Sequence, residues 1–128
     1  MPDDKRTIVI KVLRAMLWLY RGEDALRPAF VAKTDDDTWV CVHELLAALK
    51  TPTIFSDAYY LGAMTIGHAV TVHDAEKWHD MPHRRMFGLS VYPDYAQGAL
   101  YALSASAAIA VPDTAGAYLR ESFRQNAT

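Results

Sequence analysis

Charged residues are distributed unevenly along the chain, and this pattern limits the possible folds more than any other feature. Sixteen of the 28 charged residues lie in positions 1–50, eight in positions 51–112 and four in the last sixteen. Six of the middle eight fall in the twelve residues from Asp74 to Arg85. A long stretch with so few charges is expected inside a packed core. The segment 74–85 is therefore expected to be a polar loop in an otherwise apolar region.

The length of 128 residues predicts a single domain over residues 1–128, and 52% hydrophobic with 22% charged residues is typical of a chain that folds. A net charge of -2 excludes the strongly basic surface of a general nucleic-acid binder. Cys41 has no second cysteine to pair with, and the first residues lack the pattern of a signal peptide. We therefore expect a cytoplasmic protein with no membrane association.

The first half of the chain predicts three helices and one strand. Apolar residues at helical spacing predict a helix over residues 7–20 that ends at Gly22. A second, short helix is expected over 25–33, ending at a turn formed by Asp35, Asp36 and Asp37. The β-rich run 38–42 predicts a strand that leads directly into a helix over 43–50.

The second half predicts a helix over 57–66 and then two strands, 68–73 and 86–92, on either side of the polar loop. Alanine-rich residues 94–111 predict a helix, and Asp113 is expected to cap a last one. This order of elements predicts an α+β fold with a winged-helix-like core over residues 7–92, in which the polar loop is the wing. The two C-terminal helices form an extension over 94–126.

One local resemblance agrees with this fold. Residues 8–50 combine an amphipathic helix with the run Trp39-Val40-Cys41-Val42-His43-Glu44-Leu45-Leu46. This region resembles the N-terminal winged-helix lobe of the RNA 2'-phosphotransferases. Members of that family continue into an NAD-using catalytic lobe, for which too little chain remains here. The resemblance therefore implies the fold and not the activity.

Candidate binding residues lie in the wing and in the second helix of the predicted helix-turn-helix. The helix over 57–66 carries one charge, which is negative, and this argues against reading of DNA bases in the major groove. Its Tyr59 and Tyr60 suit a core or a protein-binding surface. The wing brings cationic side chains and an aromatic one into an exposed loop, as is typical of binding anchors. We expect binding through Lys77, Trp78, His79, His83, Arg84 and Arg85.

No catalytic or metal site emerges from the motifs. Four of the five histidines fall in residues 68–83, and His79 and His83 have the spacing of two ligands on one helix. Pro82 argues against a regular helix there. His43-Glu44 begins a zinc-protease motif, but Ala47 stands where the second histidine is required. We therefore predict no catalytic residues, no metal and no cofactor.

These observations favour a non-catalytic regulatory or inhibitory module that binds a macromolecule, most simply a protein partner. The C-terminal helices offer a surface for a homodimer. One alternative is a winged-helix DNA-binding regulator that contacts phosphates through its wing. Another is a small metal-dependent enzyme that uses the His/Asp loop.

Overall fold

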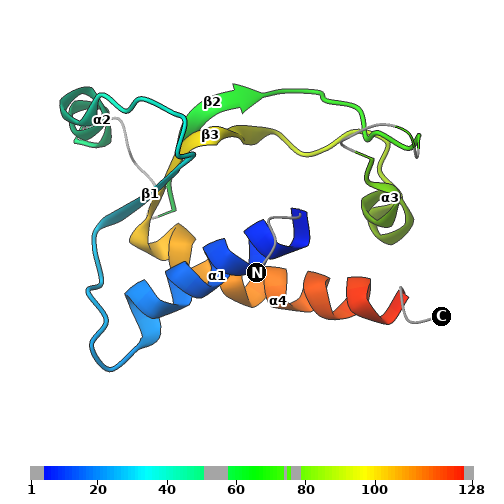
Figure 1. The fold of residues 1–128 in the computed structure, drawn as a ribbon, viewed down its shortest axis with the longest axis horizontal. Coiled ribbons are helices and arrows are strands. Elements are labelled where there is room, and N and C mark those ends of the chain that lie inside the picture. Colours follow the sequence, from blue (N-terminus) through cyan, green and yellow to red (C-terminus); the bar gives the residue numbers. More distant parts are fainter. Residues whose placement is uncertain (1–4, 51–57, 74, 76–78, 126–128) are drawn as a thin grey trace.

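The computed structural model describes residues 5–50, 58–73, 75 and 79–125. The fold is α+β, as expected, with four helices and one three-stranded sheet among the described residues (Figure 1). In chain order the elements are α1 (Lys5–Arg21), β1 (Phe30–Thr34), α2 (Val42–Leu49), β2 (Tyr60–Thr65), α3 (Met81–Phe87), β3 (Tyr95–Ser104) and α4 (Ala105–Gln125).

The sheet is built around β3, which is the last strand in the chain and the central one in space. The strand order is β1-β3-β2, and both pairings are antiparallel. Val31 of β1 lies opposite Leu103, and Leu61 of β2 lies opposite Ala102. The register of β2 shifts between Gly62 and Met64, where the ladder is irregular. Both neighbours of β3 come from far earlier in the sequence, so the sheet depends on long-range pairing.

Helices α1 and α4 lie side by side against one face of the sheet and close the hydrophobic core (Figure 1). Met16 and Tyr20 of α1 meet Leu103 of β3 and Ala108 of α4, and all four are buried. At the edge of this layer the Arg21 guanidinium donates a hydrogen bond of 2.6 Å to the Asp113 carboxylate. Helices α2 and α3 lie at opposite ends of the molecule, away from this core.

The two helices predicted at 7–20 and 43–50 are confirmed as α1 and α2, with ends that differ by one or two residues. Both segments have their apolar residues at helical spacing, and α2 is short and rich in good helix formers. The acidic triplet also lies in a turn, as predicted. These are the parts of the chain in which local sequence decides the structure.

The other elements differ from the prediction. The helices expected at 25–33, 57–66 and 94–111 are wrong, because each segment holds a strand of the sheet. The strands expected at 38–42 and 86–92 are wrong as well: residues 38–41 have no regular structure, and most of the second segment belongs to α3 or a loop. Residues 68–73 contribute one isolated bridge, between Ala69 and Val91.

These differences remove the helix-turn-helix and the wing hairpin, so the structure does not have the predicted winged-helix core. Of the two C-terminal helices expected, only the last is present, as the end of α4. The strand β3 occupies the first part of 94–111, and α4 runs from Ala105 through Pro112 and Asp113, so Asp113 does not cap it. The Ala-rich composition of β3 favours a helix locally. Hydrogen bonding to a strand on each side overrides that weak preference.

Among the described residues, no helix combines the length and apolar character needed to cross a bilayer.

Replacement of Gly62 by alanine should destabilise the sheet. An added Cβ would lie 2.5 Å from the Ala96 Cβ and 3.2 Å from the Leu100 carbonyl oxygen, which is closer than packed atoms allow. We expect Gly62→Ala to lower the free energy of unfolding by about 1–3 kcal/mol, measured by urea denaturation. Gly98→Ala is the matched control, because its Cβ would meet only the Lys33 Nζ atom at 3.9 Å. Equal stability of the two variants would contradict this packing.

The ion pair between α1 and α4 should make stability depend on pH in the acid range. The hydrogen bond from Arg21, together with its charge, lowers the pKa of Asp113 below 3.8 despite some desolvation. Because the folded-state pKa is depressed, the pair stabilises in full above the ordinary carboxyl pKa of the unfolded chain, and this contribution is lost as pH falls through the lowered pKa. We expect Asp113→Asn to lower the melting temperature slightly near neutral pH, by an amount that shrinks toward zero as pH falls through the lowered pKa. A difference that persists at low pH would exclude the ion pair as its cause.

Candidate functional site

An acidic turn of Asp35, Asp36 and Asp37 follows β1 directly and is attached to the central strand. The Asp35 N–H donates to the Ala99 carbonyl at 3.0 Å, which extends the β1–β3 ladder by one bond. The Thr38 N–H donates to the Asp35 carbonyl at 3.2 Å and closes the turn. The turn is therefore fixed at its start by the sheet, and its next two residues are exposed.

The three carboxylates of the acidic turn have different surroundings. Lys33 forms an ion pair with Asp35 and also donates a hydrogen bond of 2.6 Å to the Gly98 carbonyl. Asp36 and Asp37 are exposed. The turn thus presents two open carboxylates beside one that Lys33 neutralises.

Burial raises the pKa of Tyr101, and the nearby Tyr60 and Asp35 raise it further, so the Tyr101 phenol stays neutral at physiological pH.

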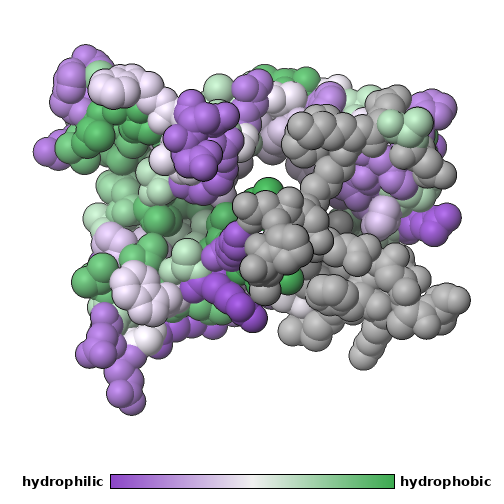
Figure 2. All heavy atoms as spheres, in the orientation of Figure 1, coloured by the Kyte–Doolittle hydropathy of each residue, from purple (hydrophilic) through white to green (hydrophobic). Residues whose placement is uncertain are grey.

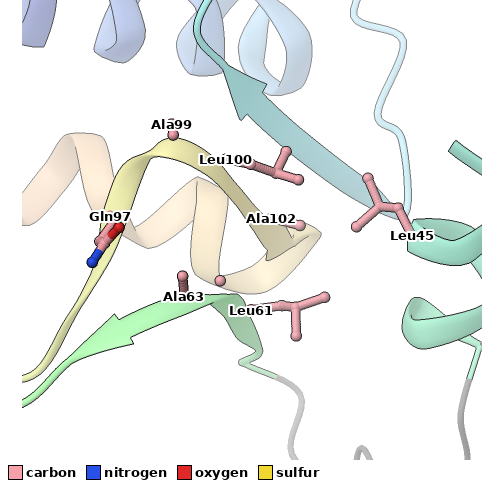
Figure 3. Close-up of a pocket in the computed structure, with 8 residues that line it drawn as sticks. Leu45, Leu61, Ala63, Gln97, Ala99, Leu100 and Ala102 are labelled. Atoms are coloured by element: carbon pink, nitrogen blue, oxygen red, sulfur yellow. The ribbon is translucent and has the colours of Figure 1, made fainter. Parts of the chain in front are cut away.

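An apolar groove of about 280 Å³ lies beside the acidic turn, on the sheet side of α2. In Figure 3 the side chains of Leu45, Leu61 and Leu100 converge on it from α2, β2 and β3. Ala99, the hydrogen-bond partner of Asp35, is also part of its lining. Figure 2 shows apolar atoms gathered around this end of the molecule. Trp39, 92% exposed, follows the acidic turn by two residues.

The predicted binding residues Tyr59 and Tyr60 lie at the start of β2 and not on a recognition helix. The Tyr59 ring packs edge-on against Phe30, with centroids 6.5 Å apart, and its backbone N–H donates to the Ser104 hydroxyl at 2.8 Å. The Tyr60 hydroxyl accepts a hydrogen bond of 2.9 Å from the Ala96 N–H. Both tyrosines therefore help to hold the sheet together.

The predicted wing residues lie around α3, at the far end of the molecule from the start of β2 (Figure 1). Arg84 and Arg85 are exposed in the last turn of this helix, where positive charge favours the helix dipole. Lys77 and Trp78 lie outside the described residues. The predicted binding residues are thus divided between two places and do not form one surface.

His79 and His83 are both half-buried, but they do not share a helix face because α3 begins after His79, at Met81. The argument that Pro82 prevents a helix here is wrong. Pro82 lies in the first turn, where the missing N–H is not needed. Asp80 caps this turn by accepting a hydrogen bond from the His83 N–H at 3.2 Å. The His83 Nδ1 atom is buried with no hydrogen-bond partner among the described residues.

Comparison with known protein families gives one match, to the Galactosyltransferase family, and it covers residues 1–117. The chain belongs to the Galactosyltransferase family. No curated protein matches the chain. The matched region of this Galactosyltransferase-family chain includes the acidic turn, the groove and all three strands of the sheet.

Membership of the Galactosyltransferase family corrects the functional expectations drawn from the sequence. The resemblance of residues 8–50 to the RNA 2'-phosphotransferase lobe is wrong, because the whole segment lies within the Galactosyltransferase match. The expectation of a non-catalytic binding module is wrong as well, since the family is one of glycosyl-transferring enzymes. The two alternatives, a DNA-binding regulator and a metalloenzyme of the His/Asp loop, have no support. The cytoplasmic location, the protein partner and the homodimer stay predictions.

The acidic turn is a candidate functional feature that the sequence pattern does not single out. The sequence predicts that Asp35, Asp36 and Asp37 form a turn that ends a helix, and this prediction assigns them no binding role. Phe30 and Val31, a few residues before the triplet, are residue types that favour a β-strand, and they are the sequence signal that a strand precedes the turn. Because β1 is an edge strand, the three carboxylates that follow it lie at the margin of the sheet.

Proposed function

We propose that this chain contributes to a glycosyltransferase site that uses a nucleotide-activated galactose as donor, with the acidic turn at the diphosphate. The observation that carries the proposal is the pair of exposed carboxylates, Asp36 and Asp37, fixed at the end of β1 inside the region that matches the family. A diphosphate and two carboxylates are both anionic, so they come together only with a cation between them.

The donor set of the acidic turn fits such a cation. Among the described residues, no three His, Cys, Asp or Glu side chains are arranged as a complete metal site. A magnesium or manganese ion bound to a nucleotide does not need one, because one or two carboxylates, phosphate oxygens and water complete its shell. Asp36 and Asp37 would supply those carboxylates. When bound, the cation would neutralise negative charge on the diphosphate leaving group.

The surroundings of the turn support this assignment by fixing its position. Galactosyl transfer breaks the bond between C1 and a phosphate oxygen, forms one between C1 and an acceptor hydroxyl oxygen, and releases the proton of that hydroxyl. Groups that stabilise the developing charge act best when they are already in place. Lys33, which is paired with Asp35, donates to the Gly98 carbonyl, and the Asp35 N–H donates to the Ala99 carbonyl, so the start of the turn is attached to β3 at two points. These contacts limit the motion of Asp36 and Asp37.

Asparagine at both open carboxylates should abolish cation-dependent nucleotide binding. We expect wild-type chain to bind UDP with Mn²⁺ and to release UDP from UDP-galactose in its presence. In the double variant Asp36→Asn/Asp37→Asn, we expect the UDP affinity in Mn²⁺ to fall roughly 10- to 100-fold, because neutral amides are weaker cation ligands. Isothermal titration calorimetry measures the affinity, and a coupled assay measures UDP release.

Asp24→Asn serves as the matched control, since Asp24 is an exposed carboxylate in the loop between α1 and β1. This control should bind UDP as the wild type does. Melting temperatures of the three proteins should agree, because the replaced groups are exposed. UDP binding that is independent of Mn²⁺, no binding by the wild type, or unchanged binding by the double variant would each contradict the proposal.

A further inference from the structure

A group of aromatic rings lies where the β2–β3 ladder ends, at a distance from the acidic turn, and Tyr92 within it also packs against His83, with centroids 4.7 Å apart. We name His68, Tyr92 and Tyr95 the ring cluster. The His68 ring centroid lies 5.9 Å from that of Tyr92 and 6.0 Å from that of Tyr95. The two tyrosine rings are 6.0 Å apart and nearly perpendicular. Each ring therefore contacts the other two.

Hydrogen bonds hold each ring of the cluster in position. The Tyr95 hydroxyl and the His68 Nδ1 atom are joined by a hydrogen bond of 2.7 Å. The Tyr92 hydroxyl donates to the Asp80 carboxylate at 3.0 Å, and the Tyr92 N–H donates to the His68 carbonyl at 2.9 Å. Rings that are fixed in this way lose little conformational freedom when a ligand binds.

The ring cluster lies at the surface and is separate from the hydrophobic core. His68 is exposed, and the two tyrosines are half-buried. The core between the sheet, α1 and α4 contains none of the three. A fixed but accessible group of rings is more typical of a binding surface than of a packing element.

The chemistry of the ring cluster fits a pyranose ring. The face of an aromatic ring carries partial negative charge, which attracts the weakly positive C–H groups on one face of a sugar. Imidazole nitrogens and phenol oxygens can meanwhile exchange hydrogen bonds with sugar hydroxyls. The Asp80 carboxylate already accepts bonds from Tyr92 and from the His83 N–H. A neutral, polyhydroxylated ligand suits this surface better than a cation does.

The sheet relates the ring cluster to the acidic turn. Asp35 is bonded to Ala99 of β3, and Tyr95 lies four residues earlier on the same strand. At the rise of an extended strand this separation is about 13 Å along β3. Both places are thus attached to the same central strand of the sheet.

We propose that the ring cluster binds the acceptor saccharide of the transfer, by stacking against one of its pyranose rings. This inference rests on the proposed function, because it assigns the second substrate of the same reaction. In this role the exposed His68 ring is the one that contacts the saccharide. Tyr92 and Tyr95 hold the His68 ring in position.

Direct binding of simple glycosides tests the assignment without any donor. The probes are methyl β-D-galactopyranoside, methyl β-D-xylopyranoside and the methyl β-glycoside of N-acetylglucosamine, each titrated into the 128-residue chain and followed by saturation-transfer difference NMR. We expect at least one of the three to bind, and His68→Ala to weaken that binding about 3- to 10-fold, which is the range for loss of one stacked ring. His43→Ala, at an exposed histidine of α2, should bind as the wild type does.

Tyr95→Phe separates stacking from the hydrogen bond, because it keeps the ring and removes the hydroxyl that holds His68. We expect a smaller loss of glycoside binding in Tyr95→Phe than in His68→Ala. All variants should melt near the wild-type temperature. If no glycoside binds, or if His68→Ala and His43→Ala bind equally, the assignment is overturned.

The nucleotide assay distinguishes this failure from a failure of the proposed function. His68→Ala should bind UDP and Mn²⁺ as the wild type does, because His68 is remote from the acidic turn. Glycoside binding without Mn²⁺-dependent UDP binding would leave the ring cluster as a sugar site and overturn the donor site. Mn²⁺-dependent UDP binding without glycoside binding would support the donor site and overturn the ring cluster as the acceptor site.

Discussion

Pairing of β3 with a strand on each side is the constraint on which the other features depend. One face of β3 contributes Leu103 to the core under α1 and α4, and the other contributes Leu100 to the groove beside α2. Ala99 receives the hydrogen bond that fixes the acidic turn. Tyr95, at the start of the same strand, belongs to the ring cluster. A single strand thus positions the core and both proposed substrate sites.

The small residues of β3 have a structural reason that local propensity does not reveal. Ala96 lies so close to Gly62 of β2 that no Cβ fits at position 62. Ala102 is 1% exposed and lies between β1 and β2. A Cβ at position 62 would clash with Ala96, and the buried Ala102 leaves little room for a larger side chain, since interiors are packed at crystal-like density. The alanines that favour a helix in isolation therefore permit a tightly packed central strand.

The acidic turn illustrates how much of a site a sequence can predict. Its location in a turn follows from three consecutive aspartates, and this prediction is confirmed. The role proposed for it does not follow from the sequence, because the sequence pattern predicts a helix before the triplet. Once Phe30–Thr34 is a strand at the sheet edge, the carboxylates lie at the end of a strand within the Galactosyltransferase match. The ring cluster was even less accessible to sequence reasoning, because His68 and Tyr92 are brought together by long-range contacts.

The sequence by itself determined α1, α2 and the acidic turn. A helix takes its backbone hydrogen bonds from residues four positions away, so spacing and propensity within one segment are sufficient to indicate it. Only the tertiary structure decided that residues 30–34, 60–65 and 95–104 are strands. A strand takes its hydrogen bonds from a distant partner, and Val31 finds its partner at Leu103. No local pattern contains that information, so the sheet and both proposed sites appear only once the chain has folded.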